Sequence, residues 1–195
     1  MSLFKSALCA ALCLLAVGSA SATPILDQQN TVMSSQLNGG SIAYEWQQGI
    51  TAGLTGQLTT IEVFAFGAAG TTQLFVNQGA PWQSDVNDWS TVALINPGWN
   101  SFDLTTANIF LHAGDQFVLG FHGAASIFEP GMGFSYGNLY AGGELFLNGF
   151  PSTGSTDPGH DLDFRTYVEP VSEPSTLALL GISLAGLGFS RRRKA

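Results

Sequence analysis

Residues 110–122 read FLHAGDQFVLGFH, and this stretch carries the period on which the fold prediction rests. Phe117, Leu119 and Phe121 are spaced by two, which is the period of a β-strand with one buried face. The residues HAGD at 112–115 separate two apolar runs and predict a tight hairpin turn. The stretch therefore predicts two short strands joined by a turn.

The same pattern continues along the chain in both directions. Helical periodicity is almost absent between Pro24 and Pro170, and the apolar runs are short and end at Gly, Asn, Asp or Pro. In one run Val63 and Phe64 are both apolar, which indicates a bulge or burial on both faces. The result is an all-β prediction, an antiparallel β-sandwich and most simply a jelly roll. The expected strands are 42–48, 58–66, 73–77, 91–95, 99–104, 109–111, 116–122, 133–136, 144–147 and 162–168.

Residues 1–22 have the pattern of a secretory signal peptide. Lys5 precedes an apolar core from Ala7 to Val17, and Ala20-Ser21-Ala22 forms a small-x-small cleavage site. Both cysteines, Cys9 and Cys13, lie within this segment. We therefore expect export across the inner membrane and cleavage by signal peptidase. The mature body would then hold neither disulfides nor cysteine metal ligands.

The predicted β-domain, residues 23–168, is strongly acidic. The whole chain has a net charge of −8, but 13 of its 14 acidic residues and only Arg165 of its six basic residues lie between 23 and 170, a net charge of −12. Affinity for nucleic acid depends on clustered Lys and Arg. Nucleic acid and anionic lipid surfaces are therefore excluded as partners, whereas neutral sugars and divalent cations are compatible.

The chain ends in an apolar segment and a basic cluster. Residues 177–189 carry no charge, and as a helix they would span about 20 Å, against roughly 30 Å for the core of a bilayer. The cluster Arg191, Arg192, Arg193 and Lys194 would stay on the cytoplasmic side. We expect a hydrophobic helix at 175–190 that inserts transiently, with a basic tail at 191–195. A short permanent anchor is the alternative.

This ending resembles the PEP-CTERM sorting tail, the substrate signal of exosortase in Gram-negative bacteria. The resemblance rests on VSEPST at 171–176, LALLG at 177–181, AGLG at 185–188 and the basic cluster. The family's Pro-Glu-Pro motif reads Ser172-Glu173-Pro174 here. The resemblance implies that exosortase cuts within the linker and motif at 169–174 and releases the body to the cell surface or an extracellular matrix. The tail is also classified as an ice-binding protein C-terminal motif, but the body lacks a Thr-x-Thr ladder and we do not predict ice binding.

A looser resemblance covers most of the body. Segments such as QQGITAG at 47–53, GWNSFDL at 98–104, AGDQFVL at 113–119 and DFRTYV at 163–168 look like those of secreted bacterial jelly rolls of the carbohydrate-binding-like type. The resemblance supports the fold alone, because folds host many unrelated functions.

One loop has the composition of a sugar-binding platform. Exposed indoles stack on sugar rings, and neighbouring polar groups fix the orientation of the ligand. The alternative is that the indoles cap the core, where large aromatic rings bury well. Trp46 and Trp99 lie within predicted strands and are expected in the core. The candidate ligand-binding residues of the loop are Trp82, Asp85, Asn87, Asp88 and Trp89.

A second loop, STDPGHDLDF at 155–164, is a candidate calcium site. It contains Asp157, Asp161 and Asp163 beside Pro and Gly, and calcium takes six to eight oxygen ligands, several of them carboxylates. The alternative is a simple turn in which Asp161 or Asp163 pairs with Arg165.

Catalytic patterns are weak, and we expect no catalytic residue. His112 and His122 flank the predicted hairpin and could approach each other, but no third zinc ligand accompanies them. The mature body also lacks a cysteine that could act as a nucleophile. The leading hypothesis is a non-catalytic surface or matrix protein associated with extracellular polysaccharide. The alternatives are a carbohydrate-binding module, possible calcium dependence included, and then a secreted glycan-active enzyme.

Overall fold

The computed structural model describes residues 22–37, 45–83, 87–122, 131–151 and 159–171. The chain divides into two units: residues 23–170 form one, and residues 1–22 together with 171–195 form the other. The predicted signal peptide, the sorting motif Ser172-Glu173-Pro174, the helix at 175–190 and the basic tail fall almost entirely outside the described residues. The described residues contain no helix long and apolar enough to cross a membrane.

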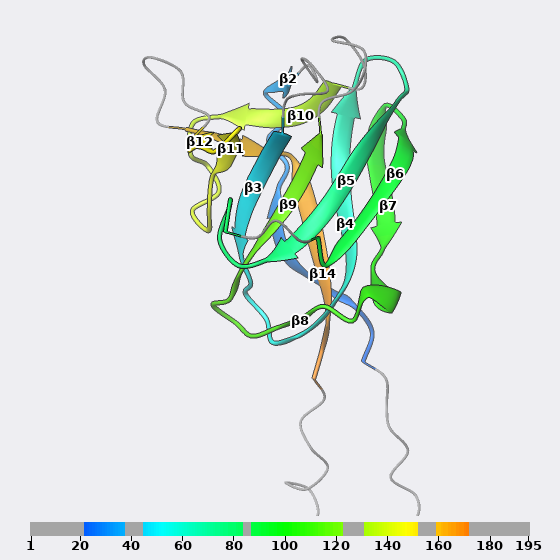
Figure 1. Ribbon diagram of the computed structural model, residues 1–195, viewed down its shortest axis with the longest axis vertical. Helices are drawn as coiled ribbons and strands as arrows, with labels where there is room; N and C mark the ends of the chain where they lie inside the picture. Colours follow the sequence, from blue (N-terminus) through cyan, green and yellow to red (C-terminus); the bar gives the residue numbers. More distant parts are fainter. Residues whose placement is uncertain (1–21, 38–44, 84–86, 123–130, 152–158, 172–195) are drawn as a thin grey trace, which may run out of the picture. The chain divides into compact units, whose positions relative to one another are not determined.

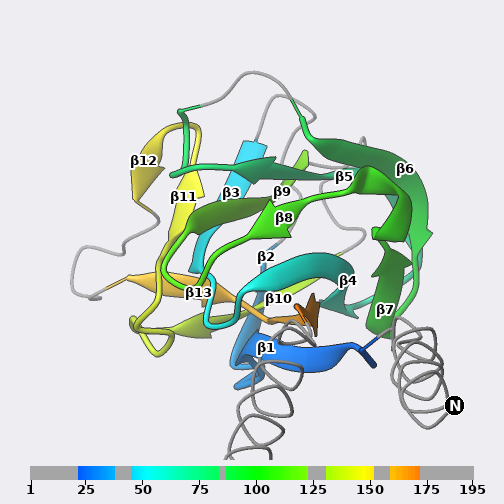
Figure 2. The same ribbon diagram turned by 90° about the horizontal axis from the view of Figure 1, so that it is seen from below.

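The 23–170 unit is built from two sheets, and every strand pair among its described residues is antiparallel (Figures 1 and 2). The eight-stranded sheet contains β1 (Ile25–Asn30), β2 (Ser35–Leu37), β4 (Gly56–Phe66), β7 (Gly98–Asp103), β8 (Phe110–Leu111), β10 (Gly131–Tyr136), β13 (His160–Leu162) and β14 (Phe164–Pro170). The six-stranded sheet has the order β12-β11-β3-β9-β5-β6. Its strands are β3 (Glu45–Thr51), β5 (Gly70–Gln78), β6 (Trp89–Ile95), β9 (Gln116–His122), β11 (Leu145–Leu147) and β12 (Phe150–Pro151).

One hydrophobic core lies between the two sheets. Phe117, Leu119 and Phe121 of β9 enter it from the six-stranded sheet, and Ile61 and Val63 of β4 enter it from the eight-stranded sheet. All five side chains are at most 1% exposed. The prediction of an all-β, two-sheet antiparallel fold is confirmed, and the finer jelly-roll topology stays a prediction.

The opening stretch, residues 110–122, folds as two strands in different sheets. β8 pairs with β4, whereas β9 pairs with β3 and β5. The turn exists, because the Asp115 N–H donates to the His112 carbonyl (2.9 Å) and the Asp115 carboxylate accepts from the His112 N–H (2.7 Å). The hairpin prediction is wrong, because the turn carries the chain from one sheet to the other.

Further differences concern strands and the core. The expected strand at 162–168 is interrupted at Asp163, where pairing changes from β10 to β4. The sequence prediction omitted β1, β2 and β12, and Glu169 and Pro170 of the expected linker belong to β14. Trp46 is in the core as predicted. Trp99 is not, because it lies beside Phe64 on the opposite face of β4 from the core residue Val63.

The bulge predicted in β4 is present at a different place. The register against β14 shifts between Tyr167 and Val168, so that Thr59 is the extra residue of β4. Phe64 and Phe66 follow the normal alternation and are half-buried on the outer face, where their rings are 4.9 Å apart.

Candidate functional site

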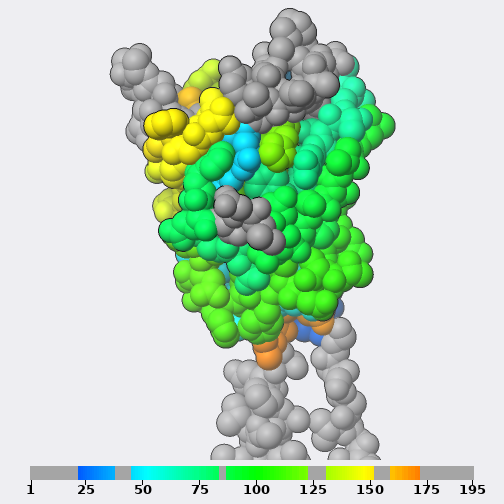
Figure 3. Space-filling view, viewed as in Figure 1, coloured from blue at the N-terminus to red at the C-terminus, as the bar shows by residue number. Residues whose placement is uncertain are grey.

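The outer face of the six-stranded sheet carries an unusual set of polar side chains. Trp46 and Ile50 of β3 point into the core, so Glu45 and Gln47 point outward. In β9 the same alternation turns His122 outward, because Phe121 is a core residue. Figure 3 looks onto this face, where atoms of β3 and β9 reach the surface beside β5.

These outward side chains line a cavity of about 270 Å³, here called the Trp82 cavity. It is formed by three adjacent strands, β3, β9 and β5, and by the chain that follows β5. Its described lining residues are Glu45, Gln47, Phe75, Asn77, Trp82, Asn87 and His122. The prediction named only Trp82 and Asn87 of this set.

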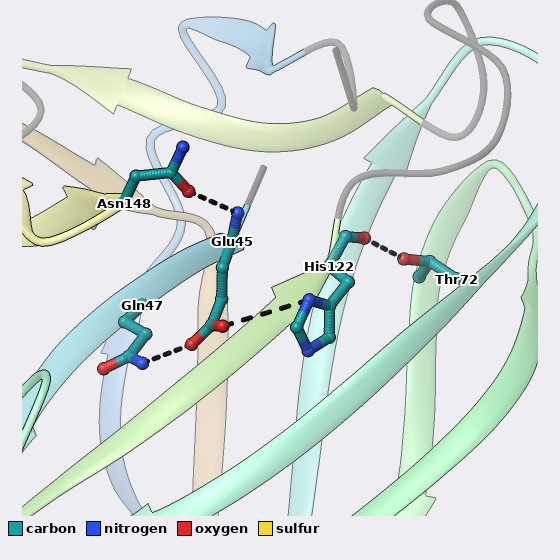
Figure 4. A network of polar contacts seen from close by, with 5 residues as sticks. All are labelled: Glu45, Gln47, Thr72, His122 and Asn148. Carbon is teal, nitrogen blue, oxygen red and sulfur yellow. Dashed lines mark hydrogen bonds and ion pairs between the residues drawn. The ribbon is translucent and has the colours of Figure 1, made fainter. Parts of the chain in front are cut away.

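Glu45 is the centre of a polar network in the cavity (Figure 4). Its carboxylate accepts a hydrogen bond from the Gln47 amide (2.5 Å) and lies 4.0 Å from Nδ1 of His122. Its backbone N–H donates to Oδ1 of Asn148 (2.9 Å). The Thr72 hydroxyl donates to the His122 carbonyl. These contacts fix the carboxylate and the imidazole side by side on neighbouring strands.

Trp82 is held at the rim by its backbone. Its N–H donates to Oε1 of Gln47 (2.9 Å), and its φ of 63° lies in the left-handed region that a bulky residue rarely adopts. The side chain is 39% exposed. Such backbone strain persists only where the surroundings impose it, and it is common at ligand sites. The indole is thus an exposed aromatic surface carried by a backbone that is held in place.

Asn77 lines the cavity and has one hydrogen-bonding atom without a partner in the described part of the chain. The residue is 4% exposed, and among the described residues its buried Oδ1 has no hydrogen-bond partner. Buried polar atoms are normally paired, because leaving one unpaired costs about 1–3 kcal/mol. A ligand hydroxyl or amide could donate to this atom.

Phe75 forms the floor of the cavity, and the position of its ring requires a glycine at residue 120. Phe75 faces Gly120 across the β5–β9 pair, and a Cβ at position 120 would lie 2.1 Å from the Phe75 ring. The ring therefore lies flat over β9 and is only 1% exposed. An apolar floor with polar walls is typical of small-ligand sites.

The other described residues of the predicted sugar platform, Asp88 and Trp89, do not line the cavity. Trp89 pairs in register with the core residue Val76 and packs against the core, with its ring 6.2 Å from that of Phe102. The Asp88 carboxylate accepts from the Gln78 N–H (2.6 Å) and does not line the cavity. Asp85 lies outside the described residues. Of the two indoles, only Trp82 belongs to the site.

The two described aspartates of the predicted calcium site are both fully buried. Oδ2 of Asp161 accepts from the N–H groups of Leu139 (2.8 Å) and Tyr140 (2.9 Å), while Oδ1 accepts from Gln48 (3.3 Å). Burial raises the pKa of both carboxyls, that of Asp163 to about 6. No group of three or more His, Cys, Asp or Glu side chains that could hold a metal occurs among the described residues. Asp157 lies outside them, so calcium binding stays a prediction.

The predicted pairing of Arg165 with Asp161 or Asp163 is wrong. The Arg165 guanidinium contacts Glu62 (3.1 Å) and stacks 3.9 Å from the centroid of the Trp99 ring. This places it on the outer face of the eight-stranded sheet, because Arg165 is opposite Glu62 in the β14–β4 register.

The predicted approach of His112 and His122 is also wrong. His112 lies four residues before the start of β9 and His122 is the last residue of that strand, and His112 packs against Phe110 whereas His122 packs against Phe75. The sequence offered one unused signal for His122. Glu45 and Gln47 alternate with the core residue Trp46, and this pattern indicates that the outward face of β3 is polar. Nothing in the local sequence indicates that β9, which carries His122, lies beside that face.

Comparison with known proteins gives a match at the C-terminal end of the sequence. No curated protein and no solved structure matches the sequence significantly. Residues 170–194 match the family model of the PEP-CTERM protein-sorting motif. This motif implies processing by exosortase, with export and sorting to the cell envelope or surface of a Gram-negative bacterium. The chain therefore carries a PEP-CTERM sorting signal at residues 170–194.

Proposed function

We propose that the protein is a non-catalytic component of the cell surface or extracellular matrix, and that its β-domain binds a neutral polysaccharide at the Trp82 cavity. The sorting signal supports the destination. The observation that carries the binding function is an exposed indole, Trp82, at the rim of a cavity that is also lined by Asn77, whose Oδ1 has no partner among the described residues.

The chemistry of the cavity suits a sugar. The C–H face of a sugar ring is apolar and stacks on an aromatic ring, whereas its hydroxyls donate and accept hydrogen bonds. Trp82 offers the ring, Oδ1 of Asn77 offers an acceptor, and the Glu45 carboxylate is a second acceptor within the same cavity. None of the described lining residues is Lys or Arg, so the site has no permanent positive charge for an acidic sugar.

The composition of the cavity also supports a binding role over hydrolysis. Glycosidases use two carboxyl groups that face each other across the scissile bond. Among the described lining residues Glu45 is the single carboxylate, and it is held by Gln47 and lies next to His122. A glycan-active enzyme is the competing function, and it predicts turnover that Glu45→Gln abolishes.

Binding is tested with extracellular polysaccharide purified from the producing cells. We expect Trp82→Ala to weaken binding at least tenfold, which corresponds to about 1.4 kcal/mol, and Asn77→Ala to weaken it less. Phe150→Ala is the matched control, because Phe150 is 75% exposed and lines neither of the two cavities described in this structure. Equal affinity of wild type and Trp82→Ala would refute the site. New reducing or unsaturated ends in the polysaccharide would refute the non-catalytic role, and a repeat with EDTA tests calcium dependence.

Sorting is tested by the intact mass of the protein recovered from its own cells. We expect a mass that lacks residues 1–22 and everything beyond about Glu173. The double substitution Glu173→Ala with Pro174→Ala should abolish the second cleavage. A mass that retains Arg191–Lys194 in the unaltered protein would instead identify a permanent anchor.

A further inference from the structure

A second and larger cavity lies on the same face of the six-stranded sheet. Its volume is about 420 Å³, and we call it the Phe146 cavity. Phe146 is opposite Gln47 in the β11–β3 register, so both side chains point to the outer face. The polar residues of its lining are Gln116, Asn138 and Glu144, and Ala141, Gly142 and Gly143 form part of its wall.

The two cavities are separated by one short segment of chain. Ala80 and Pro81 line the Phe146 cavity, and the next residue, Trp82, lines the Trp82 cavity. Pro81 lies over β3 at Gly49, because a Cβ added to Gly49 would be 3.0 Å from Cγ of Pro81. Gln47 lies two residues away on the same face of β3, and its Oε1 accepts a hydrogen bond from the Trp82 N–H. The cavities therefore follow one another along β3, with residues 80–82 between them.

The wall of the Phe146 cavity is fixed by a close backbone approach. The Gly49 N–H donates to the Glu144 carbonyl (2.9 Å), and a Cβ at Gly143 would lie 2.0 Å from the Gly49 carbonyl oxygen. Only glycine fits at position 143 without a shift of one chain. The cavity thus keeps its shape without a ligand, which reduces the entropy that binding must overcome.

We propose that the Phe146 cavity is a second subsite of the same polysaccharide site, so that the ligand is an internal stretch of a neutral chain spanning both cavities. This inference rests on the proposed function of the Trp82 cavity. Each cavity offers at least one aromatic ring and several neutral hydrogen-bonding groups, and none of the described lining residues of either is Lys or Arg. A monosaccharide or a chain end would occupy only one of them.

The test uses fragments of the producing cells' extracellular polysaccharide, prepared by partial hydrolysis and separated by length. Affinity should rise at least tenfold between the shortest fragment that binds and fragments long enough to cross residues 80–82. Ala141→Trp fills the Phe146 cavity from an exposed position. It should abolish the gain with length while it leaves the affinity for the short fragments unchanged. Ala113→Trp is the matched control, since Ala113 is exposed on the 112–115 turn and lines neither cavity.

The outcomes separate this inference from the proposed function. If Trp82→Ala removes binding but affinity does not depend on length or on Ala141→Trp, the Trp82 site stands and the second subsite is refuted. If no fragment of any length binds, both are refuted. Loss of the length dependence in Phe146→Ala, with short fragments still bound through Trp82, is the result that supports the inference.

Discussion

The replacement Asp163→Asn should stabilise the protein at neutral pH. Asp163 joins β13 to β14 and is fully buried. Its Oδ1 accepts from the Met33 N–H (3.0 Å), but the buried Oδ2 has no partner among the described residues. Oδ2 lies against Gly133, where a Cβ would be 2.8 Å away. Burial, together with the negative charge of Asp161, raises the pKa of this carboxyl from 3.8 to about 6, and the Met33 hydrogen bond opposes the rise only in part.

The sign and size of the effect follow from this pKa. A carboxyl whose pKa is higher in the folded state favours folding when it is protonated, so its contribution is fully present below pH 3.8 and is lost as the pH rises through 6. A difference of about two pKa units corresponds to roughly 3 kcal/mol. Asparagine has the same shape, keeps the acceptor for Met33 and has no charge. We therefore expect Asp163→Asn to be about 3 kcal/mol more stable than wild type at pH 7, and nearly equal to it below pH 4.

The measurement is urea unfolding of both proteins between pH 3.5 and 7.5, with tryptophan fluorescence as the signal. Asp103→Asn is the control of opposite sign. Hydrogen bonds from Thr105 lower the pKa of the exposed Asp103 carboxyl, so this variant should lose stability relative to wild type above pH 4. If the difference between Asp163→Asn and wild type is the same at all pH values, the Asp163 carboxyl does not titrate in the folded protein as argued, and the reasoning is refuted.

Three further substitutions test the packing of the sheets. Gly120→Ala should cost about 1–3 kcal/mol of stability and weaken polysaccharide binding, because the added Cβ displaces the Phe75 ring from β9 into the cavity. An unchanged midpoint of urea unfolding together with an unchanged affinity would contradict this prediction. Gln48→Leu should cost about 1–3 kcal/mol in the same assay, since the Leu162 N–H (2.7 Å) then loses its acceptor in the core. Arg165→Gln should cost no more than about 1 kcal/mol, because its ion pair is partly exposed, and the difference should shrink in high salt.

The parts of the fold that sequence predicted correctly are those in which large apolar residues alternate along a strand and face the core. β9 alternates Phe117, Leu119 and Phe121 with outward residues, and the predicted bounds of 116–122 are those of the structure. β1 was missed because its sequence, ILDQQN, is mostly polar and its side chains are mostly exposed or half-buried. The break at Asp163 was missed because an acidic residue inside an apolar run gives no sign that the strand changes partners there.

The candidate site was predictable only in part, for a topological reason. Trp82 and Asn87 were found because they belong to one loop with a recognisable composition. Glu45 and His122 belong to strands far apart in the sequence, and they meet because β3 and β9 are neighbours in the sheet. Local sequence patterns report which face a residue occupies, but the identity of the neighbouring strand depends on long-range pairing.

Electrostatics restrict the ligand more firmly than the shape of either cavity does. The body carries a net charge of −12, and its single basic residue, Arg165, is already occupied by Glu62 and Trp99 on the other sheet. An anionic polysaccharide would be repelled, and its binding would strengthen as salt screens the repulsion over a Debye length of about 8 Å. A neutral chain is held by stacking and short hydrogen bonds, which salt hardly affects. Affinity for the polysaccharide should therefore stay constant between low and high salt, and a strong increase with salt would identify a charged ligand and refute the assignment of a neutral one.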